Sequence, residues 1–436
     1  MTLQQNILLA FYGDDFTGST DALEFASNAG ATAMLFIKPP TADQLAQYPL
    51  LNVIGVAGAT RSMSPQEMED ELLPAFDRLK STGATHIHYK VCSTFDSSPT
   101  TGSIGKAMDI AQLVFPGRPI PVLGGMPALG RYCVFGNLFA KMGIGSNGEI
   151  YRLDRHPSMI NHPVTPANES DLIHHLQKQT SLKGHLIDII QQAKPIPQWL
   201  QPMQTEPGFI LFDALHEQDL LKTGEWLEDR AQQQSPLFSI GSSGIEMALG
   251  KYWNSTGKLK QVQQWPDPGV ANPLLVVSGS CSPVTEAQIS YAARSGFQLV
   301  ELNAAAAIEH SIDLEEITDK VNAHLEEGQH VLVHTGARQS TNLSSRKLGS
   351  TLGLIGKSAA EAGLTKRIII AGGDTSSYAA RAMEIDAVSM IAPLVNGAPL
   401  CRAHAANQWI DGLEVNFKGG QVGAEDYFTL CVRGKK

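Results

Sequence analysis

The feature of this sequence that most constrains its fold is a repeated alternation between short apolar runs and segments with helical periodicity. Helical patterns, such as those of residues 19–29, 65–80 and 102–114, lie between several of the apolar runs. Strands that are apolar on both faces and separated by helices are typical of a mainly parallel sheet with helices on each side. In the first 250 residues the predicted strands are 7–12, 32–37, 53–57, 86–91, 120–123, 209–212 and 237–240.

A polar stretch that becomes rich in Pro and Gly, residues 253–273, interrupts this alternation, and a new alternation follows it. Since 436 residues are too many for one ordinary core, more than one domain is expected. We predict an α/β fold with two domains, residues 1–252 and 273–436, joined by a linker over residues 253–272. Each domain is expected to contain a mainly parallel sheet flanked by helices, with a ligand cleft between the domains. The predicted strands of the second domain are 274–278, 297–302, 330–334 and 367–371.

Composition excludes several classes of protein. The formal net charge of −10, without a long basic run, argues against a nucleic-acid partner. The five cysteines are far apart and form no CxxC pair, so we expect neither a disulfide framework nor a zinc site, and a cytoplasmic location. No stretch approaches the roughly 18–20 apolar residues that a membrane span needs, so no membrane partner is expected. The sequence leaves the oligomeric state open, a homo-oligomer included.

The first predicted strand runs into a loop, residues 13–21, in which three acids and three hydroxyl residues occupy nine positions. Ligands collect at the carboxyl ends of parallel strands. Asp14 and Asp15 are therefore candidates for binding sugar hydroxyls or for acting as a general base, and the choice between them stays open. A helix cap is the alternative interpretation of such residues. A cap needs only one acceptor, so the crowding favours a functional loop.

Two cations follow neighbouring predicted strands. Arg61 comes after the third strand, and Lys90 lies at the end of the fourth, just before a Ser- and Asp-containing loop. A lone Arg or Lys is more often a solvated surface charge. Lys90, however, lies inside an apolar strand pattern. Both cations would reach the edge that carries Asp14, and Arg can bind a carboxylate through two parallel hydrogen bonds.

Gly- and Ser-rich turns recur where strands meet helices. Residues 241–244 (GSSG) follow one strand, residues 278–283 (SGSCSP) another, and residues 372–376 (GGDTS) a third. Small residues before a helix N-terminus let a phosphate approach the backbone N–H groups. The two turns of the second domain together predict a nucleotide phosphate site, with Asp374 as a candidate ligand of Mg²⁺.

Several standard signatures are absent from the sequence. The segment 349–358 ends in Gly-Lys-Ser, but Thr351 occupies the first glycine position of a P-loop and the segment has a helical pattern. No GxGxxG follows the first strand, which argues against a nicotinamide-dependent dehydrogenase. No HExxH or comparable set of metal ligands occurs.

The motifs GDDFTGSTD (13–21), ATRS (59–62), YKVCSTFDS (89–97), SGSCSP (278–283) and GGDTS (372–376) occur in this order. Together they resemble the four-carbon acid sugar kinase family, over nearly the whole chain. The resemblance implies an N-terminal domain that binds a sugar acid and a C-terminal domain that binds the nucleotide. It also implies ATP-dependent phosphorylation of the terminal hydroxyl of an acid such as threonate, erythronate or 3-oxo-tetronate.

The resemblance also implies the roles of particular residues. The acid-sugar site would contain Asp14, Arg61, Lys90, Ser93 and Asp96. Ser243, in the turn 241–244, would lie near the path of the phosphoryl group. The ATP site would be lined by Ser278, Gly279, Ser280, Ser282, Gly372, Gly373, Asp374, Thr375, Gly419 and Gly420.

One segment departs from the family pattern. Many members carry Pro-Ala-Phe-Pro followed by Gly-Arg, whereas this chain reads Met-Pro-Ala-Leu-Gly-Arg over residues 126–131. If this segment borders the sugar site, a branched acid such as 3-oxo-isoapionate is a candidate substrate. The Gly- and aromatic-rich residues 131–166 further predict a β-hairpin insertion near the cleft. The alternative function is a non-catalytic sugar-acid sensor, which would not need two phosphate-binding turns.

Overall fold

The computed structural model describes residues 6–143, 146–162, 164–199, 207–309, 313–336 and 345–435. The chain divides into two compact units. Unit 1 contains residues 1–33 and 39–262, and unit 2 contains residues 34–38 and 263–436. The chain therefore passes between the units three times. Sequence patterning did not anticipate the exchange of residues 34–38, because the run 32–37 resembles one more strand of the first domain.

Unit 1 is built on a parallel sheet with the strand order β3-β1-β4-β11-β5-β10-β9. Strands β1, β3, β4, β10 and β11 are buried along their whole length, as expected for a sheet covered on both faces. The strands are β1 (Leu9–Gly13), β3 (Val53–Ala57), β4 (His86–Lys90), β5 (Ile120–Leu123), β9 (Lys183–Ile187), β10 (Gly208–Phe212) and β11 (Leu237–Gly241).

Helices cover the sheet of unit 1 in two groups. Helices α1, α7 and α8 pack together, and α3 packs on α4. Helix α3 begins as its sequence predicts, because Ser64 and Glu67 form a capping box and Pro65 occupies the first turn. The helices are α1 (Phe16–Asn28), α2 (Ala42–Ala46), α3 (Pro65–Lys80), α4 (Ile104–Val114), α5 (Leu172–Gln177), α6 (Ile189–Gln192), α7 (Glu217–Gln233) and α8 (Gly244–Ser255). Helix α8 continues through Ser255, into the first residues of the predicted linker.

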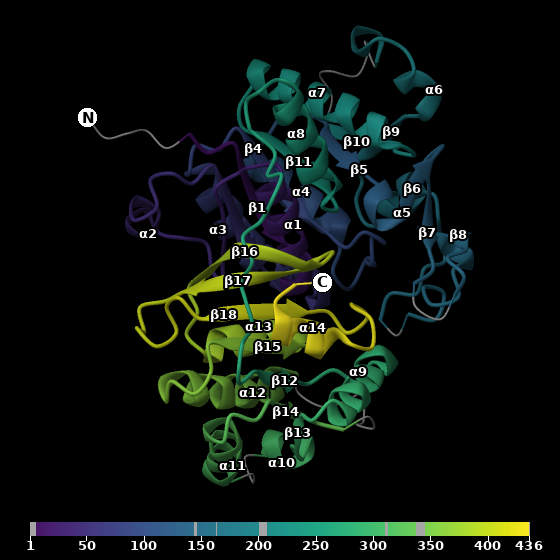
Figure 1. Ribbon diagram of the computed structural model, residues 1–436. Coiled ribbons are helices and arrows are strands. Elements are labelled where there is room, and N and C mark those ends of the chain that lie inside the picture. The colour runs from purple at the N-terminus through teal and green to yellow at the C-terminus, as the bar shows by residue number, and fades with distance from the viewer. Residues whose placement is uncertain are drawn as a thin grey trace. The chain divides into compact units, whose positions relative to one another are not determined.

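The predicted hairpin insertion is a three-stranded antiparallel sheet, β6 (Arg131–Val134), β7 (Asn137–Lys141) and β8 (Ile150–Arg152). A bridge between Asn137 and Asp171 joins it to the start of α5, and Figure 1 shows the three strands as a separate group beside that helix. A second bridge joins Cys133 to Ala214, just after β10. The insertion is thus fixed to the main sheet of unit 1.

Unit 2 has the strand order β13-β14-β12-β15-β18-β17-β16-β2. Its first five strands are parallel, whereas β16, β17 and β2 are antiparallel to their neighbours. Figure 1 shows β16 and β17 as a long antiparallel pair. The strands are β2 (Ala33–Phe36), β12 (Leu275–Ser278), β13 (Gln298–Glu301), β14 (Val331–His334), β15 (Arg367–Ala371), β16 (Ala387–Val395), β17 (Ala398–His404) and β18 (Glu414–Lys418).

The core of unit 2 is formed by side chains of the central strands and of the last helix, among them Val276, Leu332, Ile369, Leu400 and Tyr427. The rejected P-loop segment lies in a helix, as predicted. The helices are α9 (Pro283–Arg294), α10 (Ala304–Glu309), α11 (Leu314–Glu326), α12 (Ser345–Glu361), α13 (Gly373–Ala382) and α14 (Tyr427–Arg433). The prediction of a mainly parallel α/β fold is confirmed.

Candidate active site

Several predicted site residues of unit 1 lie at one edge of its sheet. Gly13 at the end of β1 is in register with Ala57 of β3 and with Lys90 of β4, and Lys90 is in register with Gly241 of β11. The loops that follow these four strands therefore leave the sheet side by side. Because β3 and β4 lie on opposite sides of β1, this edge is a topological switch point, where open α/β sheets bind ligands.

Arg61 is bound by both adjacent carboxylates. Its Nε donates to Asp14 Oδ2 at 3.0 Å, and its Nη2 donates to Asp14 Oδ1 at 2.8 Å and to Asp15 Oδ1 at 2.9 Å. The backbone N–H of Cys92 also donates to Asp14 Oδ2, at 3.3 Å. The two carboxylates and the guanidinium thus form one cluster, tied to the loop after β4.

The two carboxylates differ in their acidity. Burial raises the pKa of Asp14, although the charge of Arg61 opposes it. Burial also acts to raise the pKa of Asp15, but the charges of Arg61 and Lys90 outweigh it, so this pKa is lowered. Environments that move the pKa values of neighbouring acids apart are typical of acid–base sites. Asp14 is the more basic of the two, and Asp15 is held ionised.

Asp15 also caps helix α1. Its Oδ1 accepts from the backbone N–H of Gly18 at 2.9 Å, and its Oδ2 accepts from Thr17 Oγ1 at 2.9 Å. The capping interpretation of this loop is therefore correct for Asp15, in addition to its contact with Arg61. Asp14 has no such role in the helix cap, and its oxygens accept instead from Arg61 and from the backbone N–H of Cys92.

Lys90 lies among the carboxylates of the first loop. It is 3% exposed, and its charge acts to lower the pKa values of Asp14, Asp15 and Asp21. A Cβ atom at Gly18 would lie only 2.4 Å from Lys90 Nζ and 2.4 Å from Asp15 Oδ1. Gly18 is thus needed so that Lys90 can reach this position.

The loop after β4 carries Ser93 and Asp96, and both residues are half-buried. Asp96 Oδ1 accepts a hydrogen bond from Thr94 Oγ1 at 2.8 Å. Between them, Phe95 has a φ of 55°, in the left-handed region that bulky residues seldom adopt. Such a conformation persists only where the surroundings enforce it, and it is common at binding sites.

Ser243 is more buried than we expected for a residue near the path of the phosphoryl group. It is fully buried, and its hydroxyl donates to Asp21 Oδ2. Burial raises the pKa of Asp21, and Asp21 Oδ1 has no hydrogen-bond partner among the described residues. Ser243 therefore supports Asp21 in this structure. Asp21 was visible in the first motif, but its spacing did not distinguish it from a surface residue of α1.

The predicted phosphate loops of unit 2 also start at one edge. Ser278 at the end of β12 is in register with Ala371 of β15, and Ala371 is in register with Lys418 of β18. The backbone N–H of Gly279 donates to Ala371 O at 3.1 Å, and that of Gly372 donates to Lys418 O at 2.8 Å. The structure thus brings together the three segments that the sequence assigned to the nucleotide.

Lys418 ties two of these segments together. Its Nζ donates to Thr285 Oγ1 at 2.9 Å and to Gly419 O at 3.1 Å, and Thr285 Oγ1 in turn donates to Gly420 O at 3.1 Å. Ser282 caps α9 and also donates to Gly420 O. Burial lowers the pKa of Lys418 to about 8. Such a network holds the helix N-terminus and the last loop in one arrangement.

The GGDTS loop provides a second helix N-terminus. Gly372 has a φ of 122°, which side-chain-bearing residues avoid, and a Cβ there would lie 2.7 Å from Thr375 Oγ1. Asp374 is exposed in the first turn of α13. Among the described residues, no group of three or more His, Cys, Asp and Glu side chains could hold a metal ion. A single carboxylate suits Mg²⁺, which takes its other ligands from phosphates and water.

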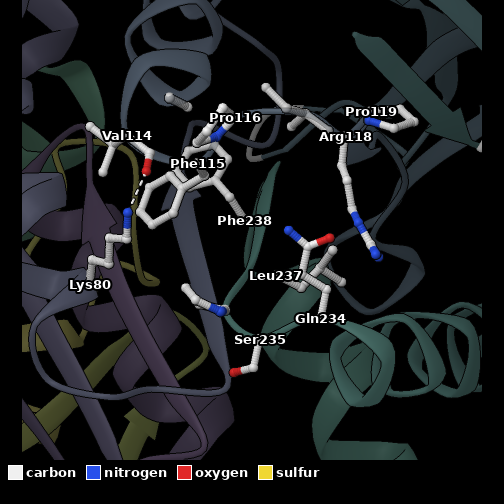
Figure 2. Close-up of a pocket in the computed structure, with 13 residues that line it drawn as sticks. Lys80, Val114, Phe115, Pro116, Arg118, Pro119, Gln234, Ser235, Leu237 and Phe238 are labelled. Carbon is white, nitrogen blue, oxygen red and sulfur yellow. Dashed lines mark hydrogen bonds between the residues drawn. The ribbon is translucent and has the colours of Figure 1, made fainter. Parts of the chain in front are cut away.

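A separate cavity lies at the opposite, amino-terminal end of the sheet of unit 1. It has a volume of about 180 Å³ and lies at the starts of β5 and β11 (Figure 2). Phe115, Arg118 and Phe238 line it, and Lys80 Nζ donates there to Val114 O at 2.7 Å. Since parallel sheets bind ligands at their carboxyl ends, we assign no part of the reaction to this cavity.

The families that match this chain correspond to the two predicted functions of its N-terminal and C-terminal parts. Residues 9–249 match the family described as a sugar-binding N-terminal domain, and residues 275–428 match the nucleotide-binding C-terminal domain. A 3-oxo-isoapionate kinase of Paraburkholderia graminis is 38% identical over 452 residues, covering 98% of this chain and 95% of that protein. The chain belongs to the four-carbon acid sugar kinase family. The predicted family and the predicted sugar-acid kinase class, with ATP as donor, are therefore confirmed, and the sensor alternative is not favoured.

Other members of the family are more distant. A 3-oxo-tetronate kinase of Pseudomonas savastanoi pv. phaseolicola is 26% identical, covering 98% of this chain and 97% of that protein. A solved structure from Salmonella typhimurium LT2 matches the fold with a TM-score of 0.79 at 22% identity, covering 99% of both chains. One from Haemophilus influenzae matches with a TM-score of 0.71 at 22% identity, covering 97% of this chain and 98% of that chain. No helix in the described part of the chain is both long and apolar enough to cross a membrane.

Proposed function

We propose that this kinase phosphorylates a primary hydroxyl of a small branched sugar acid, 3-oxo-isoapionate or a close analogue. The observation that carries the proposal is the difference in identity between the relatives. The 3-oxo-isoapionate kinase is 38% identical over nearly the whole chain, whereas 3-oxo-tetronate kinases are 25–28% identical. The departure at residues 126–131, which adjoin β6 of the insertion, supports an acid of different shape from a plain tetronate.

On the acceptor side, the proposed site contains Asp14, Asp15, Lys90, Ser93 and Asp96. The attacking hydroxyl would lie beside Asp14, which orients it and accepts its proton as the new P–O bond forms. Lys90 supplies positive charge next to these carboxylates. Phosphoryl transfer depends mainly on positioning and charge stabilisation, so this arrangement needs no covalent intermediate.

On the donor side, the phosphates of ATP would bind the backbone N–H groups at the starts of α9 and α13. The loops at Ser278–Ser282, Gly372–Thr375 and Gly419–Gly420 would line this site. We propose that Mg²⁺ binds Asp374 together with the phosphate oxygens. When bound, the ion would neutralise charge on the transferred phosphoryl group. The proposed donor and acceptor sites belong to different units, so transfer requires the γ-phosphate of ATP to reach the acceptor hydroxyl.

We also propose a cellular location and an oligomeric state for the enzyme. All five cysteines are free, which supports our proposal of a reducing, cytoplasmic location. A homo-oligomer stays a proposal without a defined interface, and sedimentation of the purified protein would test it.

The test of the function is an ADP-release assay with ATP and Mg²⁺ against a panel of sugar acids. The panel contains D- and L-threonate, D- and L-erythronate, the 3-oxo-tetronates and 3-oxo-isoapionate. We expect 3-oxo-isoapionate to have the highest kcat/KM. A preference for a tetronate would contradict the proposed substrate, and absence of turnover with every acid would contradict the proposed reaction.

A further inference from the structure

The cations at the carboxyl edge of unit 1 differ in what they already bind. Arg61 uses Nε and Nη2 for Asp14 and Asp15. Lys90 lies among the carboxylates of the first loop, whose charges it offsets. Two cations and three carboxylates leave no net positive charge for the carboxylate of an incoming sugar acid. A further cation near this edge would favour its binding.

A short series of hydrogen bonds connects Arg131, on β6, to the same edge of the sheet. Its backbone exchanges hydrogen bonds with Met126, from Met126 N to Arg131 O at 2.8 Å and from Arg131 N to Met126 O at 3.2 Å. The sulfur of Met126 accepts a hydrogen bond from Ser242 Oγ at 3.8 Å. Ser242 directly follows Gly241, the residue in register with Lys90. Arg131 is therefore placed beside the strand ends that carry the acid-sugar site.

Hydrogen bonds hold one edge of the Arg131 guanidinium, whereas the other edge has no hydrogen-bond partner among the described residues. Its Nη1 donates to Leu129 O at 3.0 Å and to Lys141 O at 3.2 Å. Its Nε is buried and has no hydrogen-bond partner among the described residues. A buried donor without a partner costs free energy unless a ligand satisfies it. The Nε–Nη2 edge is the one with which Arg binds a carboxylate through two parallel hydrogen bonds.

The surroundings of Arg131 include the loop after β4. Burial lowers the pKa of Arg131, whereas its electrostatic interactions with Cys92 and Asp96 act to raise it, which places both residues near the guanidinium. Arg61 lies near Cys92 as well. The loop is thus flanked by two guanidinium groups, and Arg131 is the one whose Nε is buried without a hydrogen-bond partner among the described residues.

We infer that Arg131 binds the carboxylate of the sugar acid, while Arg61 stays with Asp14 and Asp15 and orders the reactive end of the site. This inference rests on the proposed function for the identity of the ligand. It replaces the prediction that Arg61 holds the substrate carboxylate. It also gives the Gly-Arg pair of residues 130–131 a role in recognising the acid.

The test compares wild type with Arg131→Gln, Arg131→Lys and the matched control Arg118→Gln, which alters a guanidinium at the opposite end of the sheet. The ligands are 3-oxo-isoapionate and its neutral primary amide. ADP release gives kcat and KM, and calorimetry without ATP measures binding independently of turnover. Loss of a charged pair of hydrogen bonds is expected to raise KM for the acid about 10- to 100-fold in Arg131→Gln.

The preference for acid over amide separates a binding role from a structural one. We expect this preference to fall about 10- to 100-fold in Arg131→Gln, in part in Arg131→Lys and not in Arg118→Gln, with KM for ATP unchanged in all three. An unchanged preference in Arg131→Gln, with turnover intact, overturns the inference alone. Binding of the acid that depends on Arg131 but leads to no ADP release supports the inference and overturns the proposed function.

Discussion

Lys418 is a buried ammonium group whose donors are already in use. They bind Thr285 Oγ1, Gly419 O and, at 3.4 Å, Gly420 O. Since an ammonium has three N–H donors and a neutral amine has two, loss of the proton breaks one of these bonds. The arrangement of the proposed phosphate loops therefore depends on the protonation of one residue.

This dependence predicts the effect of pH on ATP binding. The pKa of Lys418 is lowered to about 8, so the cation is present below pH 8 and is lost as the pH rises through that value. We expect the Kd for ATP, measured by calorimetry, to be constant from pH 7 to 7.5 and to rise by up to about tenfold per pH unit above 8.

Two variants serve as controls. Lys418→Met should bind ATP weakly at every pH with a flat profile. Lys357→Met, which alters an ammonium on α12 that pairs with Glu361 and Glu384, should keep the wild-type profile. A wild-type Kd that stays constant up to pH 9.5 would show that the proton of Lys418 does not matter.

At the scale of single residues, the sequence could predict where a side chain lies in the fold better than which group that side chain binds. Asp14 and Lys90 were predictable because Asp14 directly follows β1 and Lys90 is the last residue of β4, and strand ends of a parallel sheet meet at one edge. The partner of Arg61 was not predictable, since it depends on the short 3-10 turn Thr60–Ser62, which directs the guanidinium to Asp14. Arg131 gave only the weak signal of a Gly-Arg pair in a divergent segment.

Helix α1 has a glycine in its first turn whose replacement tests the site. Ala is a better helix former than Gly by about 1 kcal/mol, so Gly18→Ala would stabilise an isolated helix. Here the added Cβ would lie 2.4 Å from both Lys90 Nζ and Asp15 Oδ1, and one of them must move. We therefore expect Gly18→Ala to lower kcat/KM for the sugar acid at least tenfold, without a gain in Tm.

Gly356→Ala on α12 is the matched control. The nearest atom to its added Cβ would be the flexible Met383 Sδ, at 3.3 Å. This variant should keep its kcat/KM and gain up to about 1 kcal/mol of stability in thermal unfolding. Wild-type kinetics in Gly18→Ala would mean that Lys90 and Asp15 need not keep their places beside Gly18.

At the scale of elements, apolar strands were predicted well and amphipathic ones were missed. Strands β3, β5 and β15 have the predicted bounds, because short runs of branched apolar residues are seldom compatible with anything but a buried strand. Strand β9 contains Lys, Gly and His and lies at the edge of its sheet. Strands β16 and β17 are antiparallel strands with polar positions, and β18 contains Glu, Asn and Lys. Their identity depends on neighbours that are distant in the sequence.

At the scale of the whole molecule, residues 34–38 are the feature that no local pattern could reveal. Strand β2 follows α1 directly in the chain, yet Leu35 and Phe36 pair with Val388 and Ala387 of β16 in unit 2. The backbone N–H of Ile37 also donates to Asp386 O at 2.9 Å. Unit 2 therefore completes its sheet with a strand from the other end of the chain.

This pairing predicts how a fragment of the chain will behave. Residues 263–436 alone would leave β16 as an exposed edge strand, so we expect the fragment to self-associate in size-exclusion chromatography. Fusing residues 31–40 to it through a flexible Gly/Ser linker should restore a monomer with a higher Tm. The same fusion with Leu35→Asp and Phe36→Asp should not. A bare fragment that is monomeric and equally stable would mean that β2 contributes little to unit 2.

The pairing of β2 with β16 also means that its two strands are synthesised at very different times. Residue 36 leaves the ribosome about 350 residues before its partner in β16, residue 387. At typical bacterial and eukaryotic elongation rates this delay is on the order of 20–70 seconds. Unit 1 can reach its native topology in that interval, but the edge of β2 that pairs with β16 has no partner until the C-terminal residues are made. We therefore expect the yield of active kinase to depend on how long this edge of β2 stays free of wrong pairings during translation.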